Sequence, residues 1–519
     1  MTLGEMLSES AERYGEKAAL VFRDVPLSYS ALWAAVQGVA TGLSALGIGQ
    51  GDKIGLLLPN CPPFVMSLYG AAFIGAVTVP VNPLLKPAEL EYIWRDSGVK
   101  LVVTAGALLP NVVAARPQLP DLKHIVLITP KSELSEELRD TAGLLEFSEL
   151  LSVGYGIHIS DLILPEPSDC AVIIYTSGTT GHPKGAMLSH HNLLSNVGQI
   201  QKVLKFEPTD VLMTTLPLFH SFAGTVCMHL VLATGGSAVL MENFVPTKIM
   251  ETLETHKVTI FPAVPAMLNA LLNLKTEREY DLAALRYFVS GGAPLPSATL
   301  AAVETKFGVT VLEGDGPTEC SPVTSINPPV GVRKVNSVGL ALPGVEVAIF
   351  DDGDQPVPID TVGEIVVRGD NVMIGYLNQP EATAEAMTGG WYHTGDLGTI
   401  DSDGYIFIVD RKKDMIISGG LNVYPREIEE VLYSHVAVLD AAVIGISDAL
   451  RGEDVMAVIV KKPDAAVSER EIVAYCRERL ANYKVPRKVL FRETLPRGGT
   501  GKVVKRLLKK ELEMESVAS

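Results

Sequence analysis

The sequence predicts an α/β protein with a large N-terminal domain and a smaller α+β C-terminal domain. Apolar strand-like runs alternate with helical patterns as far as residue 312, and short strands with close turns follow from Ser337. After the charged run 410–414 the chain becomes basic. At 519 residues the chain is too long for one hydrophobic core. We therefore expect two doubly wound parallel-sheet subdomains, a small β-barrel-like subdomain and a separate C-terminal domain.

The first parallel-sheet subdomain is predicted from strands at 53–58, 77–81 and 101–104 and helices at 64–74 and 89–95. Residues 64–81 carry no charge over 18 positions, which is the lower end of the length that spans a membrane. Pro62, Pro63 and Pro80 bracket this stretch and Gly75 interrupts it. We interpret it as a buried helix followed by a short strand, not as a membrane span.

The second subdomain repeats the same alternation after Lys257. Its predicted strands are 258–261, 287–290 and 309–312, and its predicted helices are 267–274 and 299–306. Ligands of such sheets bind beyond the carboxyl ends of the strands, where the loops 175–185 and 290–294 both fall. We expect these two loops to face one crevice.

Short strands at 345–350, 363–368, 391–393 and 405–409 predict a small antiparallel sheet or barrel. The run Asp-Arg-Lys-Lys-Asp at 410–414 marks the predicted boundary between domains 1–410 and 411–519. The second domain is expected to contain strands at 415–417, 437–446 and 454–460 and helices at 425–433 and 468–480.

Charge and cysteine content narrow the class of protein. The net charge of −17 argues against nucleic-acid binding, whereas residues 411–519 carry 20 Lys+Arg against 16 Asp+Glu. Such a basic piece is either a solvated face or a domain that closes over an anionic ligand. Five scattered cysteines without metal-ligand spacing predict buried free thiols and a reducing cytoplasm. The amphipathic, acid-containing segment 1–14 does not resemble a secretory signal.

The loop 175–185 reads Tyr-Thr-Ser-Gly-Thr-Thr-Gly-His-Pro-Lys-Gly and follows a buried apolar run. Glycines let backbone N–H groups approach an anion, hydroxyls add donors, and Lys184 supplies a positive charge. A polar turn between a strand and a helix would explain the glycines but not the hydroxyls and the lysine. The spacing differs from that of a nucleotide-hydrolase P-loop, so we predict a different triphosphate loop.

Further motifs follow in order along the chain. They are Leu-Pro-Leu-Phe-His at 216–220, Ser-Gly-Gly-Ala-Pro-Leu at 290–295, Glu-Gly-Asp-Gly-Pro-Thr-Glu at 313–319, Tyr-His-Thr-Gly-Asp at 392–396, the run 410–414, Ser-Gly-Gly at 418–420 and Pro-Arg-Gly-Gly-Thr-Gly-Lys at 496–502. With the loop 175–185, these motifs resemble AMP-forming acyl-CoA synthetases of the adenylate-forming superfamily, nearly end to end. Within that superfamily the chain resembles bacterial medium- and long-chain fatty acid–CoA ligases.

The resemblance implies that a carboxylate attacks the α-phosphate of ATP, pyrophosphate leaves, and CoA then displaces AMP. Mg²⁺ and preorganised donors stabilise the charge that develops, without an enzyme nucleophile. It implies catalytic roles for Lys184, His220, Thr318, Glu319 and Lys502, with Thr176 and Glu319 as the magnesium ligands. The implied ATP and AMP contacts are Thr176, Ser177, Gly178, Thr179, Thr180, Gly181, Lys184, Gly292, Ala293, Glu313, Gly314, Asp315, Gly316, Thr318, Asp396, Arg411 and Lys502. Gly419 and Gly420 are implied to line the CoA tunnel, and Lys413 to be the hinge of a mobile C-terminal domain.

Several of these residues have ordinary readings as well. A lone histidine such as His220 in an apolar stretch is commonly a core residue, and Lys502 in a basic tail is commonly solvated. The chain also departs from its relatives. Asp315 stands where many of them stack an aromatic ring on adenine, Ile416 and Ile417 stand where some carry a lysine, and Gly498 and Gly499 precede the Lys502 loop. Asp315 affects the expected base stacking, not the reaction class.

The sequence therefore predicts a cytoplasmic, ATP- and Mg²⁺-dependent acyl-CoA synthetase for a carboxylic acid, with a medium- or long-chain fatty acid favoured. A CoA ligase for an aromatic or alicyclic acid is the near alternative. A luciferase-like oxygenase and a non-catalytic nucleotide-binding protein are distant alternatives. We expect no nucleic-acid partner and no transmembrane segment; peripheral membrane contact and a homodimer stay open.

Overall fold

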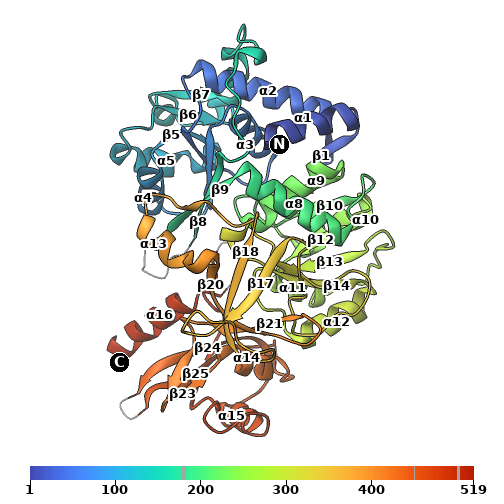
Figure 1. Ribbon diagram of the computed structural model, residues 1–519, viewed down its shortest axis with the longest axis vertical. Helices are drawn as coiled ribbons and strands as arrows, with labels where there is room; N and C mark the ends of the chain where they lie inside the picture. The colour runs from blue at the N-terminus through green and yellow to red at the C-terminus, as the bar shows by residue number, and fades with distance from the viewer. Residues whose placement is uncertain (177–182, 449–450, 464, 499–502, 519) are drawn as a thin grey trace.

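The computed structural model describes residues 1–176, 183–448, 451–463, 465–498 and 503–518. Its large N-terminal part holds two extended sheets and a smaller antiparallel sheet, and a separate α+β domain forms the C-terminal end (Figure 1). This arrangement confirms the predicted fold class. The boundary at residue 410 stays a prediction.

An eight-stranded sheet carries the first part of the chain. In spatial order its strands are β19 (Gly375–Tyr376), β9 (Lys184–Ser189), β8 (Cys170–Thr176), β4 (Val77–Pro80), β3 (Lys53–Leu57), β5 (Val99–Thr104), β6 (His124–Leu127) and β7 (Leu144–Glu146). Strands β8 to β7 run parallel, whereas β9 and β19 pair antiparallel. The helices of this part are α1 (Leu3–Tyr14), α2 (Tyr29–Ala45), α3 (Pro62–Phe73), α4 (Pro87–Ser97), α5 (Leu109–Ala115), α6 (Glu136–Arg139) and α7 (Phe147–Val153).

The apolar stretch 64–81 forms helix α3 followed by strand β4. Pro62 starts the helix because its missing N–H would have no intrahelical partner there. Gly75 has a φ of +70°, which lets the chain turn back into the sheet. Among the described residues, no helix is both long and apolar enough to cross a membrane.

A nine-stranded sheet carries the second repeat. Its strands in order are β16 (Leu340–Ala341), β15 (Ser325–Ile326), β14 (Thr310–Asp315), β13 (Tyr287–Ser290), β12 (Ile260–Ala263), β10 (Val211–Thr214), β11 (Ser237–Leu240), β1 (Ala18–Phe22) and β2 (Val25–Ser28). Strands β14 to β1 run parallel, and the edge strands pair antiparallel. Its helices are α8 (His190–Leu204), α9 (Leu230–Thr234), α10 (Pro246–Thr255), α11 (Pro265–Leu272) and α12 (Ser297–Phe307), with the π-helix η5 (Ala223–His229) and the 3₁₀ turn η6 (Thr318–Cys320).

The predicted small β subdomain is a four-stranded antiparallel sheet. Its order is β17 (Val345–Phe350), β18 (Gly363–Gly369), β20 (Tyr392–Ile400) and β21 (Ile406–Arg411). Helix α13 (Pro380–Ala386) lies between β19 and β20 in the chain. Strand β20 runs further than the predicted 391–393, because it pairs with β18 on one side and β21 on the other.

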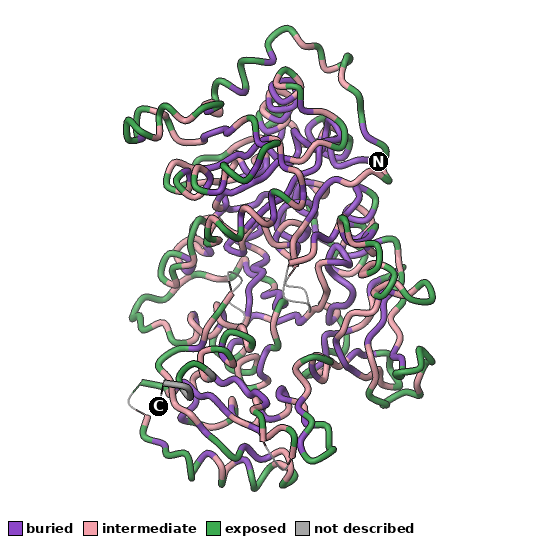
Figure 2. The backbone as a smooth tube through the Cα atoms, turned by 90° about the vertical axis from the view of Figure 1, so that its left-hand side faces the viewer, coloured by how far each residue is buried: buried purple, intermediate pink, exposed green. Residues whose placement is uncertain are grey.

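The C-terminal domain contains strands β22 (Ile416–Ser418), β23 (Leu421–Val423), β24 (Val438–Asp448), β25 (Gly452–Lys461) and β26 (Lys488–Arg492), with helices α14 (Pro425–Tyr433), α15 (Glu469–Arg477) and α16 (Lys505–Ala518). It has an apolar core of its own, built from α14, α15 and the central strands. Figure 2 shows this buried backbone at the lower end of the molecule, apart from the larger buried region above. All five cysteines are free thiols, as predicted.

The phosphate loop joins two strands of one sheet. Strands β8 and β9 pair antiparallel, with Tyr175 opposite Gly185 and Thr176 opposite Lys184. The loop is therefore the tip of a hairpin and not a turn from a strand into a helix. Ser177, Gly178, Thr179, Thr180 and Gly181 lie outside the described residues.

Candidate active site

A buried carboxylate joins the two large sheets. Glu319, in the turn η6 after β14, is 7% exposed. Its Oε1 accepts hydrogen bonds from Thr176 Oγ1 at 3.2 Å and from the Tyr376 hydroxyl at 2.9 Å. Its backbone carbonyl accepts a bond from Met373 N at 2.7 Å. The end of β8 and the turn after β14 therefore meet at one point, although 143 residues separate them.

Lys184 belongs to the same group of side chains around Glu319. Its Nζ lies 5.1 Å from the centre of the Tyr376 ring, whose hydroxyl donates to Glu319. Burial, followed by the charge of Glu319, raises the pKa of Tyr376, so this hydroxyl stays protonated and remains a donor at neutral pH. Lys184, Tyr376, Glu319 and Thr176 thus form one connected group.

Helix α4 holds both rims of the phosphate loop. The Tyr92 hydroxyl donates to the Pro183 carbonyl at 3.2 Å, directly before Lys184. The Tyr175 hydroxyl donates to Asp96 Oδ2 at 2.5 Å, directly before Thr176. Both bonds reach from the last residues of the hairpin to one helix, so α4 sets where the loop begins and where it ends.

Thr318 and His220 come from two neighbouring segments. Thr318 Oγ1 lies 3.0 Å from Ser221 Oγ. His220 precedes Ser221 and accepts a hydrogen bond from Phe222 N on its Nδ1 at 3.2 Å, which leaves the ring oriented by its own backbone turn. The segment 216–220 therefore reaches the turn that carries Glu319.

The predicted adenine-side residues lie at the end of strand β14 and directly after it. Glu313 is 5% exposed, and burial raises its pKa to about 7. Gly314 and Asp315 pair with Ile326 and Ser325 of β15. A Cβ at Gly316 would lie 1.8 Å from the Pro322 carbonyl oxygen, so only glycine fits there.

Two residues of the small sheet form an ion pair at its edge. Asp396 on β20 and Arg411 on β21 stand opposite each other in the register, with Arg411 Nε 3.1 Å from Asp396 Oδ1. The carboxylate of Asp396 is the main cause that raises the pKa of Arg411, and Asp414, Asp315 and Glu319 add to it. Three of these four acids, Asp396, Asp315 and Glu319, are residues predicted for the nucleotide site, and their charges all act on Arg411.

The loop after β13 places Gly292 with a φ of +76°, followed by the half-buried Ala293. It stands at the carboxyl end of a parallel strand, as predicted for one wall of the crevice.

The glycines assigned to CoA are not gathered with the other site residues. Gly419 and Gly420 form the exposed turn between β22 and β23 with φ values of +60° and +80°, and Gly419 N donates to Arg451 O within the same domain. Lys413 lies in the turn that follows β21. Lys502 lies outside the described residues.

The residues present suit Mg²⁺. Among the described residues, no group of three His, Cys, Asp or Glu side chains could hold a metal by itself. Mg²⁺ usually takes one or two carboxylates and completes its six oxygen ligands with water and substrate phosphates. The carboxylate of Glu319 with the hydroxyl of Thr176 is a donor set of this kind.

Sequence reasoning missed four side chains that the structure brings to the site: Tyr376, Ser221, Tyr92 and Asp96. Each acts through a hydrogen bond to a predicted site residue or to a rim of the phosphate loop. None of these four residues belongs to a motif that we singled out, so the sequence offered no signal for these contacts.

Comparison with known proteins identifies the group to which the chain is related. The family model described as "AMP-binding enzyme" matches residues 7–377, and "AMP-binding enzyme C-terminal domain" matches residues 427–502. The chain belongs to the AMP-binding enzyme family. It is an AMP-forming acid–thiol ligase, for which ATP and CoA are substrates and Mg²⁺ is the usual ion.

Three relatives show the breadth of this family. A long-chain-fatty-acid–CoA ligase of Bacillus subtilis (strain 168) is 35% identical over 99% of this chain and 95% of its own length. The long-chain-fatty-acid–CoA ligase FadD13 of Mycobacterium tuberculosis (strain CDC 1551 / Oshkosh) is 37% identical over 94% of this chain and 93% of its own. The crystal structure of the anthranilate CoA ligase AuaEII, in complex with anthranoyl-AMP, has a TM-score of 0.91 and 29% identity, covering 100% of this chain and 98% of that one.

Proposed function

We propose that this AMP-forming acyl-CoA ligase activates a fatty acid of medium or long chain. The names of relatives at 35–37% identity over nearly the whole chain support this proposal. The observation that carries it in the structure is an apolar pocket directly beside Thr318.

This pocket has mostly apolar walls and a polar mouth. Its lining residues are Leu68, Pro80, Val172, Ile174, Leu193, Leu218, His220, Ser221, Gly224, Thr225, Met228 and His229. We take Ser221 as the mouth, because its hydroxyl lies 3.0 Å from that of Thr318. An acid bound here would place its carboxylate next to the nucleotide residues and its tail among aliphatic side chains.

The proposed division of work is the one that the family resemblance implies, and the contacts among Thr176, Tyr376 and Glu319 support it. Lys184 neutralises the β- and γ-phosphates, Thr318 contacts the α-phosphate, and Glu319 with Thr176 holds the ion. Asp396 accepts hydrogen bonds from the ribose hydroxyls, because a carboxylate offers only acceptors to a diol. Mg²⁺ supplies Lewis-acid stabilisation of the phosphoryl charge when it is bound.

The C-terminal domain, which we take as 411–519, completes the reaction in this proposal. Lys502 pairs the acyl carboxylate with the α-phosphate during adenylation. Rotation about Lys413 then brings Gly419 and Gly420 to the site for attack by CoA. The exposed position of this turn in the structure suits the adenylation arrangement.

A CoA ligase for an aromatic acid is the second candidate, favoured by the TM-score of 0.91 to the anthranilate CoA ligase. Acid-dependent pyrophosphate release, measured over straight-chain and aromatic acids with and without CoA, decides between the two. We expect the highest kcat/KM with a straight-chain acid and thioester formation only when CoA is present. A higher kcat/KM for a benzoate would overturn the fatty-acid assignment.

A further inference from the structure

One wall of the acid pocket is a single face of a helix. The pocket residues from this segment are Ser221, Gly224, Thr225, Met228 and His229. Most of this segment is the π-helix η5, and all five residues line the pocket, so they share one side of it. Ser221, which we take as the mouth, lies beside Thr318. A tail that enters there therefore runs along this face toward His229.

At the far end of that face the lining residue His229 is hydrogen-bonded to Tyr69, which does not itself line the pocket. The Tyr69 hydroxyl, from α3, lies 2.8 Å from His229 Nδ1, and the two rings meet edge to face with centres 5.6 Å apart. Tyr69 is 0% exposed and His229 is 2% exposed. Burial lowers the pKa of His229 to about 3, so the ring is neutral at physiological pH. The Tyr69 hydroxyl and His229 Nδ1 are therefore hydrogen-bonded to each other, and the pair carries no net charge.

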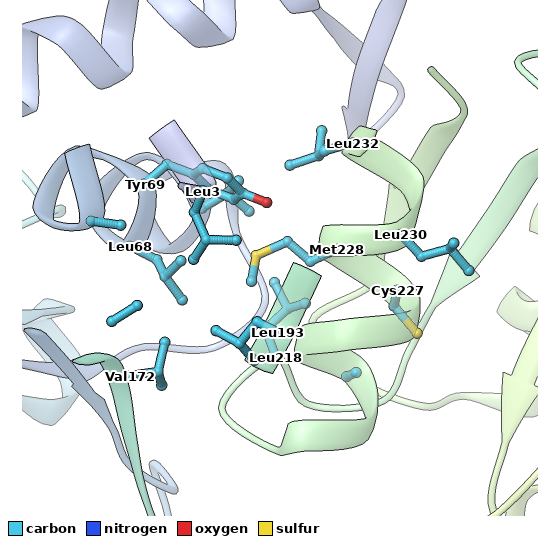
Figure 3. Close-up of a cluster of buried hydrophobic side chains, with 14 of the residues drawn as sticks. Leu3, Leu68, Tyr69, Val172, Leu193, Leu218, Cys227, Met228, Leu230 and Leu232 are labelled. Atoms are coloured by element: carbon cyan, nitrogen blue, oxygen red, sulfur yellow. The ribbon is translucent and has the colours of Figure 1, made fainter. Parts of the chain in front are cut away.

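The remaining walls are aliphatic and close together. Figure 3 shows Leu68, Val172, Leu193, Leu218 and Met228 gathered in one region, with Tyr69 next to them. The cavity between the walls has a volume of about 10 Å³, which is room for about one water molecule. A bound tail must displace a wall, and Met228 is the adaptable one because its side chain is unbranched and has three rotatable bonds.

We propose that the Tyr69–His229 pair is the floor of the acyl-tail pocket and limits the substrate to a medium-chain acid. This inference rests on the proposed function and narrows it. The nine residues from Ser221 to His229 make eight steps, which rise about 12 Å at the 1.5 Å of an α-helix and somewhat less where the segment is π-helical, a length that an extended chain of about eight to ten carbons covers. Longer tails would meet the His229 ring, which a hydrogen bond to Tyr69 holds in place.

Two matched double variants test the floor. Tyr69→Phe/His229→Leu removes the hydrogen bond but keeps the bulk, whereas Tyr69→Phe/His229→Ala removes the same bond and opens space. The kcat/KM is measured for straight-chain acids from butanoic to hexadecanoic, by pyrophosphate release and by loss of the CoA thiol. We expect the wild type and the Leu variant to share an optimum near octanoic acid. The Ala variant should move the optimum to longer acids, with about a tenfold or larger gain in the ratio of hexadecanoic to octanoic acid.

A third variant narrows the pocket instead of enlarging it. A Cβ added at Gly224 would meet only the Leu218 carbonyl oxygen, at an ordinary 3.7 Å, so Gly224→Leu adds a side chain to the pocket wall without a backbone clash. We expect it to lower the ratio of octanoic to butanoic acid by about tenfold or more, with the KM for ATP unchanged.

The outcomes separate this inference from the proposed function. If the wild type releases no pyrophosphate with any acid, the proposed function fails and the floor fails with it. If the wild type is active but prefers hexadecanoic acid, or if the Ala and Leu variants have the same chain-length profile, the floor alone is wrong. Thermal unfolding shows whether the double variants fold; if either does not, an unchanged ratio in Gly224→Leu overturns the inference.

Discussion

At the scale of single residues, the site depends on what one buried carboxylate can do. Glu319 accepts two hydroxyl hydrogen bonds on one oxygen, from Thr176 and Tyr376. Lys184 stands over the ring of the same tyrosine. The predicted metal ligand and the predicted phosphate ligand are thus both in contact with one shared side chain, Tyr376. The assignments of Glu319 and Lys184 stay predictions until the variants below are measured.

Replacing Glu319 or Lys184 should lower kcat. Glu319→Gln keeps the shape and the acceptor oxygen but removes the charge that would hold Mg²⁺, and Lys184→Ala removes the cation. Loss of one group that stabilises transition-state charge typically costs about 10²- to 10³-fold in kcat. Pyrophosphate release at saturating ATP and acid measures this effect. The exposed Lys248→Ala on α10 is the control; turnover in the Gln or Ala variant equal to that of the control would remove the residue from the mechanism.

At the scale of elements, the hairpin β8–β9 and helix α4 belong together. The antiparallel pairing brings both ends of the phosphate loop to one place, and Tyr92 and Asp96 of α4 bind the two ends by hydrogen bonds. Such bonds reduce the freedom of the loop rims before ATP arrives, which lowers the entropy cost of binding. The two hydrogen bonds to α4 should therefore affect ATP binding more than the chemical step.

Tyr92→Phe should therefore raise the KM for ATP more than it changes kcat. One hydrogen bond of this kind contributes about 1 kcal/mol, which corresponds to roughly a fivefold change. Steady-state kinetics with varied ATP give both constants. Tyr155→Phe, at a tyrosine that is 99% exposed, is the matched control and should match the wild type. A fall in kcat with an unaltered KM would contradict the anchoring role.

At the scale of the whole molecule, two charged residues of helix α14 connect the C-terminal domain to the N-terminal part by hydrogen bonds. Arg426 of α14 is 8% exposed, its backbone N donates to Asp410 Oδ2 at 2.9 Å, and its Nη1 donates to Ile408 O at 2.7 Å. Glu430 of α14 accepts a bond from Ser297 N at 3.4 Å. Burial has the largest effect on the pKa of Glu313 and raises it. The charge of Arg426 lowers this pKa, and the charge of Glu430 raises it.

The pKa of about 7 at Glu313 predicts a pH-dependent stability. The folded state keeps this proton up to about pH 7, whereas the unfolded chain loses it near its ordinary pKa of about 4.3. The free energy of unfolding should therefore fall as pH rises between these two values and then level off, by up to about 4 kcal/mol in all. Thermal unfolding of Glu313→Gln between pH 5 and 8 should show a smaller pH dependence than the wild type. The exposed Glu381→Gln on α13 should keep the wild-type dependence, and the same dependence in Glu313→Gln would contradict the assignment.

The two half-reactions should fail separately if the C-terminal domain alternates. Lys502→Ala should lose pyrophosphate release, because the developing charge is left unpaired, yet still convert supplied acyl-adenylate to thioester. Lys413→Pro should spare pyrophosphate release and slow thioester formation, because a fixed φ near −65° disfavours rotation of the hinge. Lys413→Ala, which keeps the rotation free, is the control. Equal losses in both assays for both variants would point to one fixed arrangement.

The sequence predicted the fold class well because hydrophobic periodicity is local. Strand β13 and helix α14 begin and end where the pattern placed them, and the stretch 64–81 was assigned correctly from its prolines and Gly75. Strand β23, strand β26 and helix α16 were missed. Strand β23 is three residues long, β26 is fixed by parallel pairing with β25, and α16 lies in a charged tail that reads as solvated.

By itself, the sequence determined the order of the motifs, because each motif is a short local run, and the family that these motifs resemble implied the reaction class. Only the tertiary structure decided which motifs touch. It joined Thr176 to Glu319 and Ser221 to Thr318, and it left Gly419 and Gly420 in an exposed turn. It also brought Tyr69 against His229 across 160 residues, at the end of the acid pocket. Pairing over such separations follows from sheet order and helix packing, and no local pattern of residues encodes it.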